Sequence, residues 1–314
     1  MAELPCTLHD LTEVRARRPA AVSAAAAART RRPLLDGTGR LFLIAADHPA
    51  RGSLGVSGQP MAMANRLDLL ARIQVALARP GVHGVLGTAD LLEDLLLLGA
   101  LENRVVFGSM NRGGLLGASF ELDDQFTGCD APTLAAMGFD GGKMLLRIDP
   151  ADPGSLRTLR ACANAVNQLA ASSLTALVEP FISYRDHAGA VRNDLSTDAM
   201  VRAVSVAAGL GATSAYTWLK VPVVADMERV AEASTLPTLL LGGDPGRDPD
   251  AVFDGWARAL KLPGVRGLVA GRALLYPPDG DVASSRLPTT TVACGRAARS
   301  ASVAAARDSQ NIGR

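Results

Sequence analysis

Eight short apolar runs separated by helical patterns predict an α/β protein built as a (β/α)8 barrel, or TIM barrel, with an N-terminal helical extension. The composition favours the same fold, because 48% of the residues are hydrophobic while only 4% are aromatic. A core of Ala, Val, Leu and Ile suits a parallel sheet covered by helices. The length of 314 residues is one that α/β barrels use as a single unit.

The expected strands are apolar runs at residues 41–46, 82–86, 104–108, 143–148, 174–178, 214–219, 238–241 and 265–270. The expected helices show apolar periodicity at residues 62–78, 89–101, 155–171, 197–210, 224–233 and 249–260. An open doubly wound sheet is the structural alternative. It is disfavoured because no Gly-x-Gly-x-x-Gly motif follows the first strand to open a helix.

The domain organisation predicted is a helical extension over residues 1–38, a barrel over 39–280 and a tail over 281–314. The extension is rich in Ala and Arg, which favours a leading helix packed across one end of the barrel. A nucleic-acid-binding arm is the weaker alternative, since no aromatic residues are interleaved with the arginines. The tail is expected to be a small helix or a frayed end. Residues 109–130 form a long polar connection that we expect to fold over the mouth of the barrel.

The overall charge and the cysteines limit the classes of partner. A formal charge of +1 gives no reason to expect a nucleic acid or a membrane, so the expected partner is a small molecule. The four cysteines are scattered, and the four histidines share no short spacing, so we expect reduced thiols, no metal and no cofactor. With no membrane span or leader visible, we expect a cytoplasmic protein, and alanine- and leucine-rich helices suggest a homo-oligomer.

The active site of a (β/α)8 barrel lies at the C-terminal ends of its strands, so the residues that follow each apolar run are the candidates. They are Asp47 and His48 after the first run, Glu179 after the fifth, Lys220 after the sixth, Gly242 and Gly243 after the seventh, and Gly271 and Arg272 after the eighth. Lys143 begins the fourth run, where it fits less well unless that strand starts earlier.

Lys220 is the candidate nucleophile. The chain has only three lysines, and burial at a strand end penalises the charged form of an amine. A neutral amine can attack a ketone to form an iminium, which accepts electrons when the adjacent carbon–carbon bond breaks. The alternative is a lysine that simply reaches solvent from a strand end.

The neighbouring candidates fit an iminium reaction. Lys143 would favour the neutral form of the nucleophile by like-charge repulsion. Glu179 is placed to move protons, and Asp47 to orient substrate hydroxyls. The glycines after the last two strands, together with Arg272, form a pattern by which barrels hold a phosphate group.

Five segments in order resemble the strand motifs of class I, Schiff-base aldolases of the deoxyribose-phosphate, tagatose-bisphosphate and sulfofructose-phosphate group. They are Gly138–Leu146, Leu177–Pro180, Trp218–Pro222, Leu240–Gly243 and Leu268–Ala273. The resemblance implies that Lys220 forms the Schiff base, that Lys143 is its neighbour, that Glu179 is the acid/base, and that Gly243 and Arg272 grip a phosphate.

The segment Ala45–Gly52, Ala-Ala-Asp-His-Pro-Ala-Arg-Gly, is similar to an actinobacterial branch associated with inositol catabolism. That similarity implies that His48 and Arg51 contact the substrate. It also implies 2-deoxy-5-keto-gluconate 6-phosphate as substrate, cleaved to dihydroxyacetone phosphate and malonate semialdehyde. The sequence departs from relatives at Leu241, where a serine is common, and at His48, where several have glutamine.

Two other hypotheses remain open at this stage. One is a different iminium reaction in the same barrel, either that of a sulfosugar-phosphate aldolase or a transaldolase-type transfer. The other is a non-catalytic barrel that binds a sugar phosphate, which would keep Gly243 and Arg272 but would need neither Lys220 nor Glu179.

Overall fold

The computed structural model describes residues 5–243, 249–277 and 279–283, and in these residues eight parallel strands close into a barrel. Strand order is β4-β3-β2-β1-β9-β8-β7-β5, and β4 pairs with β5 to complete the ring. The strands are β1 (Leu41–Ala45), β2 (Gly84–Gly87), β3 (Val105–Ser109), β4 (Gly141–Ile148), β5 (Thr175–Arg185), β7 (Thr217–Pro222), β8 (Thr238–Leu241) and β9 (Val265–Ala270). The predicted (β/α)8 fold is confirmed.

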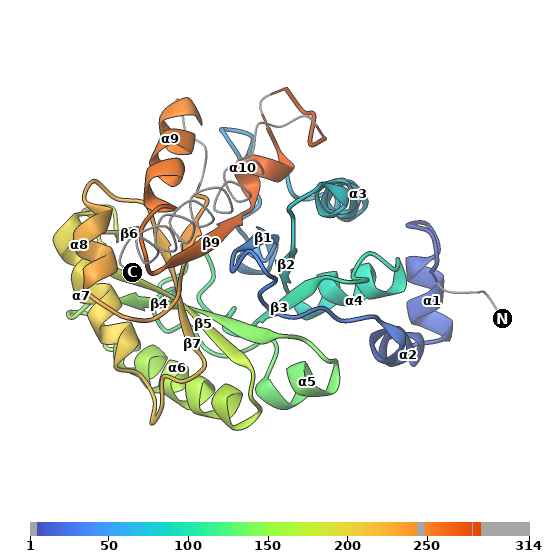
Figure 1. Ribbon diagram of the computed structural model, residues 1–314, viewed down its shortest axis with the longest axis horizontal. Helices are drawn as coiled ribbons and strands as arrows, with labels where there is room; N and C mark the ends of the chain where they lie inside the picture. The colour runs from blue at the N-terminus through green and yellow to red at the C-terminus, as the bar shows by residue number, and fades with distance from the viewer. Residues whose placement is uncertain (1–4, 244–248, 278, 284–314) are drawn as a thin grey trace, which may run out of the picture.

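Helices surround the strands, as Figure 1 shows. They are α3 (Arg66–Ala78), α4 (Ala89–Leu97), α5 (Ala131–Ala136), α6 (Gly154–Ala171), α7 (Thr197–Ala208), α8 (Met227–Glu232), α9 (Pro249–Ala259) and α10 (Arg272–Leu275). The short helix α5 was not predicted, because its six residues are too few to show a periodic pattern. Nowhere in the described ranges is a helix long and apolar enough to cross a membrane.

The N-terminal extension forms two short helices, α1 (Leu11–Arg17) and α2 (Ala21–Ala28), where a single leading helix was expected. Pro19 lies between them, and a proline inside a helix removes a backbone hydrogen bond and clashes with the preceding turn. Both helices lie on the outer side of α4 (Figure 1). The predicted C-terminal tail falls outside the described residues from position 284 onward.

The strands alternate their side chains between the barrel interior and the surrounding helices. In β1, Leu41 and Leu43 point inward, while Phe42 and Ile44 pack against the helices. The inward residues form one apolar cluster that includes Leu41, Leu43, Ala45, Leu86, Val105, Phe107, Leu177, Trp218, Leu239 and Val269. The barrel interior is therefore packed with apolar side chains, and polar side chains can meet only at its two ends.

Strands β4 and β5 are longer than predicted, and their length matters for the site. β4 begins at Gly141, two residues before the predicted run, and Lys143 pairs with Ser109, the last residue of β3. Lys143 therefore lies at the C-terminal level of the neighbouring strand, although it is early in its own strand. β5 continues to Arg185 and pairs in antiparallel fashion with β6 (Val191–Asn193), a hairpin that the sequence did not predict.

Arg29 anchors the extension to the barrel, and its replacement is the first prediction. Arg29 is 6% exposed, and its guanidinium donates to the carbonyl oxygens of Arg104 at 2.8 Å and Gly138 at 2.7 Å. Arg29→Ala leaves these carbonyls without their donor, so we expect the free energy of unfolding to fall by about 2 kcal/mol. Urea denaturation followed by circular dichroism measures the change.

The matched control is Arg17→Ala, because the Arg17 side chain is 77% exposed and pairs with Glu13 on the same helix. It should change the free energy of unfolding by less than about 0.5 kcal/mol. Equal losses in the two variants would show that Arg29 does not anchor the extension.

Candidate active site

Four ionisable side chains from different strand ends meet directly above the apolar cluster in the barrel interior. They are Asp47, Lys143, Glu179 and Lys220, which are between 2% and 6% exposed. Their positions follow from strand alternation, because Leu177 and Trp218 point inward and so therefore do Glu179 and Lys220, two residues later. In β5 and β7, the polar residue occupies the next inward position after the last apolar residue of the interior cluster.

Lys143 lies between the two carboxylates. Its Nζ is 2.5 Å from Glu179 Oε2 and 3.3 Å from Asp47 Oδ2. Lys220 Nζ lies 3.2 Å from the same Glu179 oxygen, so one carboxylate oxygen receives both amines. The lysine that fitted the predicted pattern least well is thus at the centre of the cluster.

Burial and neighbouring charges shift these groups in opposite directions. Burial lowers the pKa of Lys143. The negative charges of Asp47 and Glu179 oppose that effect, and the resulting pKa of Lys143 is about 8. Burial alone would raise the pKa of Glu179, but Lys143 and Lys220 outweigh it and hold the value at about 2. Glu179 is therefore a carboxylate at neutral pH and can accept a proton, while Lys143 has a weakly held one.

Asp47 is fixed by a residue that the sequence analysis missed. Arg112 Nη2 lies 2.8 Å from Asp47 Oδ2, and Arg112 Nη1 donates to the Asp47 backbone carbonyl at 2.8 Å. Ser109 Oγ donates to the same Oδ2 at 3.0 Å. Burial works against the charge on Asp47, yet Arg112 and Lys143 hold its pKa well below the ordinary value. Asp47 is therefore ionised, and these contacts orient its carboxylate.

Arg112 belongs to the polar segment after β3, which lies across the C-terminal end of the barrel as predicted. Asn111 fixes the start of this segment, since its side-chain amide donates to the Leu145 carbonyl at 2.6 Å and accepts from the Leu145 N–H at 2.8 Å. Arg51 donates to the carbonyls of Asn111 at 2.7 Å and Gly114 at 2.9 Å. Arg51 also forms a buried ion pair with Asp124.

The resemblance placed Arg51 at the substrate, whereas the contacts observed for Arg51 are to the segment that carries Arg112. The structure therefore does not bring Arg51 together with Lys143, Glu179 and Lys220. Gly114 is needed for this contact, because a Cβ there would lie 2.4 Å from the Glu121 carbonyl oxygen and 2.9 Å from Arg51 Nη1. A sequence signal was present in the Asn-Arg-Gly-Gly run, but nothing in it says which strand end the arginine reaches.

His48 begins a short 3-10 helix, His48–Arg51, directly after Asp47. Burial lowers the pKa of its imidazole to about 3; Asp47 opposes this shift and Arg272 assists it. The ring is neutral at physiological pH, and within the described residues its Nδ1 is buried without a hydrogen-bond partner. Gly271 permits this position, because a Cβ on it would lie 2.5 Å from the Ala45 carbonyl and 3.0 Å from His48 Cε1.

The structure describes the residues predicted to bind a phosphate but not the residues 244–248 that follow Gly243. Arg272 is the first residue of α10, and its charge acts on His48, so it lies at the same end of the barrel. Gly242 is buried after β8, and Gly243 has a φ of 63° next to residues 244–248, which are outside the description. A phosphate role for these residues stays a prediction.

A metal site is not apparent in the described part of the chain. No three His, Cys, Asp or Glu side chains there gather in a way that could hold an ion. In the cluster itself, each carboxylate already contacts a lysine or an arginine. The chemistry available from the described groups is that of two amines, two carboxylates and a neutral imidazole.

The fold and this cluster define a (β/α)8 barrel protein with a lysine-centred site at the C-terminal ends of its strands. The chain belongs to the Cgl0159-like family, whose model matches residues 39–288. The solved structure of Cgl0159 from Corynebacterium glutamicum is 53% identical, with a TM-score of 0.87, over 91% of this chain and 95% of that one. A search of curated proteins gave no match.

More distant solved structures share the fold. An archaeal fructose 1,6-bisphosphate aldolase is 14% identical with a TM-score of 0.59, over 86% of this chain and 98% of its own. A Schiff-base-forming fructose-1,6-bisphosphate aldolase is 16% identical with a TM-score of 0.58, over 87% of this chain and 98% of its own. At these identities the likeness is one of fold.

The pairing of Asp47 with Arg112 yields the second prediction, a pH-dependent coupling. In a double-mutant cycle with Asp47→Asn and Arg112→Met, we expect a coupling of about 2 kcal/mol at pH 7. Because the folded pKa of Asp47 lies below its unfolded value, the coupling should be complete above about pH 4 and decline as the pH falls through the folded value.

Urea unfolding of the four proteins at several pH values between 3 and 7 measures this coupling. Arg229→Met is the control, since the Arg229 side chain is 55% exposed and pairs with Asp198 on the barrel surface. A coupling near zero at pH 7, or one that grows on acidification, would contradict the assignment.

Proposed function

We propose that the chain is a class I aldolase, a carbon–carbon lyase that cleaves a phosphorylated keto sugar or keto acid through a Schiff base on Lys220. The observation that carries the proposal is the buried contact of Lys220 Nζ with Glu179 Oε2 at 3.2 Å. A nucleophilic amine beside a carboxylate that can take and return protons is the arrangement that iminium formation requires.

The reaction can be followed atom by atom. Neutral Lys220 attacks the ketone carbon, and the amine proton moves to the new alkoxide through Glu179, giving a carbinolamine. Protonation of its hydroxyl expels water and leaves an iminium. A base removes the proton of the hydroxyl on the far carbon of the scissile bond, that carbon leaves as an aldehyde, and the bonding electrons form an enamine. Protonation of the enamine carbon and addition of water then release the second product and the free amine.

The two remaining charged groups have distinct parts in this proposal. Asp47, held by Arg112 and Ser109, is a fixed acceptor for a substrate hydroxyl. Lys143 is a cation whose proton is weakly held, with a pKa of about 8, so it can supply a proton to a departing oxygen and regain it. Its charge also keeps Glu179 ionised between proton transfers.

The substrate is proposed as a phosphate ester. Arg272 supplies a guanidinium at the mouth, and the buried His48 Nδ1 offers a hydrogen bond to a polar substrate group. The specific proposal, 2-deoxy-5-keto-gluconate 6-phosphate cleaved to dihydroxyacetone phosphate and malonate semialdehyde, is drawn from the sequence resemblance of residues 45–52. A cytoplasmic homo-oligomer that acts in inositol catabolism is part of the same proposal.

The third prediction tests the Schiff base. Incubation with dihydroxyacetone phosphate and borohydride should reduce the iminium to a stable secondary amine and add one adduct per chain, which intact-protein mass spectrometry detects. Peptide mapping should place the adduct on Lys220, and Lys220→Met should abolish both the adduct and turnover.

Lys261→Met is the matched control, since Lys261 is the exposed third lysine of the chain and lies after α9. It should retain the full adduct and full activity. An adduct on Lys143 would reassign the nucleophile. Binding of dihydroxyacetone phosphate without any adduct would contradict this donor and support a non-catalytic sugar-phosphate barrel.

The fourth prediction concerns Glu179. Glu179→Gln keeps the shape of the side chain but removes its proton acceptor, so kcat should fall by about 10²- to 10⁴-fold. Because Lys220 remains, slow borohydride trapping on Lys220 should still occur over long incubation. Steady-state kinetics and trapping time courses measure the two effects. Unchanged kcat in the folded variant would remove Glu179 from the mechanism.

The choice of substrate has its own assay. Purified protein is incubated with 2-deoxy-5-keto-gluconate 6-phosphate, a sulfosugar phosphate and fructose 1,6-bisphosphate, and the released triose phosphate is measured by coupled oxidation of NADH. The proposal expects the first to give the highest kcat/KM. Preference for the sulfosugar phosphate would keep the mechanism and change the substrate.

A further inference from the structure

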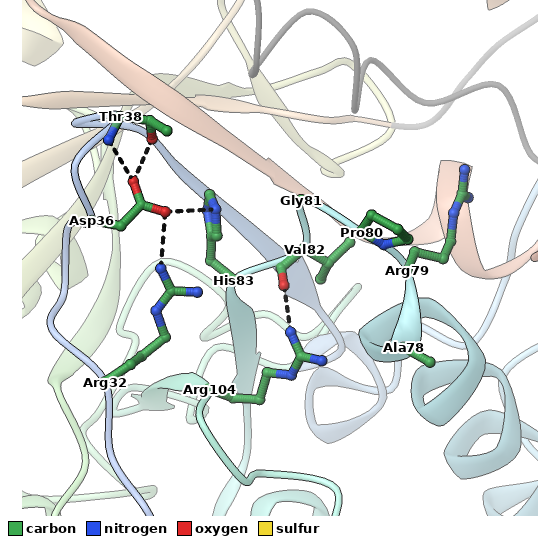
Figure 2. A pocket seen from close by; sticks show the side chains of 10 residues that line it. All are labelled: Arg32, Asp36, Thr38, Ala78, Arg79, Pro80, Gly81, Val82, His83 and Arg104. Carbon is green, nitrogen blue, oxygen red and sulfur yellow. Dashed lines mark hydrogen bonds and ion pairs between the residues drawn. The ribbon is translucent and has the colours of Figure 1, made fainter.

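A cavity of about 440 Å³ lies at the end of the barrel opposite the lysine cluster. Its walls come from Asp36 and Thr38 before β1, from Arg79 to His83 between α3 and β2, and from Arg104 before β3 (Figure 2). Because the strands are parallel, these residues mark the N-terminal ends of β1, β2 and β3. The cavity is therefore separate from the site built on Lys220, and its volume suits a small metabolite.

The described residues that line this cavity carry an excess of positive charge. Three are arginines, namely Arg32, Arg79 and Arg104, while Asp36 is the only carboxylate among them. Burial lowers the pKa of Arg104, and the charge of Arg32 lowers it further, so the two guanidinium groups act on each other. Arg79 lies on the far wall, where it donates to the Val282 carbonyl at 3.0 Å.

The single carboxylate already has its partners. Asp36 Oδ1 accepts from the Thr38 N–H at 2.8 Å and from the Thr38 hydroxyl. Asp36 Oδ2 lies 3.1 Å from Arg32 Nη2 and 3.6 Å from His83 Nε2 (Figure 2). Asp36 is thus oriented by Thr38 and shared by two donors, and it does not neutralise the second arginine of the pair.

The Arg104 side chain lines the cavity, and no carboxylate of the described residues forms an ion pair with it. Across the described ranges the one hydrogen bond of its guanidinium is from Nη1 to the Val82 carbonyl at 2.7 Å, so most of its five donors are available to a ligand. His83 adds a neutral donor, because burial followed by Arg32 lowers its pKa and its Nδ1 accepts from the Phe42 N–H at 2.9 Å. The proton of the neutral ring is therefore on Nε2, on the side of Asp36.

We propose that this cavity is a second ligand site, which binds the phosphate group of a small metabolite between Arg32 and Arg104. Guanidinium groups match a phosphate because their planar N–H pairs meet two oxygens at once. A dianion between two arginines would offset their mutual repulsion, which the Asp36 carboxylate relieves only for Arg32. The proposal does not depend on the reaction assigned to Lys220.

The fifth prediction tests the site by calorimetry with inorganic phosphate and with glycerol 3-phosphate. Arg104→Gln and Arg32→Gln should each weaken binding at this site by at least about tenfold. Arg229→Gln, an exposed arginine on α8, is the control and should bind as the wild type does. Arg272→Gln separates any phosphate bound at the catalytic end, so the two sites are counted independently.

A second measurement needs no variant. Phenylglyoxal modifies accessible arginines, and peptide mapping after modification should show that phosphate protects Arg32 and Arg104 in the wild-type protein. Tighter binding of the ester than of inorganic phosphate supports a metabolite as the ligand, and equal binding supports a site for the phosphate group alone. Unchanged stoichiometry in Arg32→Gln/Arg104→Gln, together with no protection of either arginine, overturns the proposal.

Discussion

The contact of Lys143 with Glu179 and Asp47 is the interaction on which the rest of the site depends. Ionised side chains in an apolar barrel are strongly disfavoured unless each is paired and hydrogen-bonded. Lys143 satisfies both carboxylates at once, and Lys220 and Arg112 complete the pairing at Glu179 and Asp47. Removing Lys143 would leave each carboxylate with a single cationic partner, so the cluster constrains the four strand ends and the segment that carries Arg112.

That constraint explains why so much polar structure lies across one end of the barrel. Arg112 can hold Asp47 only if its backbone is fixed, and Asn111 and Arg51 fix it. The Arg51 charge in turn requires Asp124, and Glu121 of the same segment pairs with Arg147 of β4. These buried ion pairs and hydrogen bonds hold the segment against the strand ends that carry the cluster.

The alternation of apolar runs with helical patterns made most of the fold predictable from the sequence. Glu179 and Lys220 were found because each follows an apolar run that was expected to be a strand. Lys143 was harder to place for two reasons. Gly141 and Gly142 begin β4, but glycines do not show the apolar pattern of a strand. The stagger between neighbouring strands, which pairs Lys143 with Ser109, cannot be read from the sequence of one strand. The contact of Arg112 with Asp47 could not be predicted, since an irregular segment has no repeating pattern that says where its side chains point. The motif that contains Arg51 suggested a substrate contact, which stays a prediction, but it gave no sign of the ion pair that Arg51 forms with Asp124.

The charges in the cluster also bear on the covalent lysine intermediate that we propose. An iminium on Lys220 has the same formal charge as a protonated Lys220, so the Glu179 carboxylate at 3.2 Å faces the same charge in both states. Electrostatic groups that are already oriented need no reorganisation when the charge develops. In the proposed cleavage a substrate hydroxyl loses its proton, and the negative charge that develops there would be offset by Lys143 and Arg112. One fixed set of five charges can thus stabilise the cationic intermediate and the developing anion, provided that the two form on opposite sides of Glu179 and Asp47.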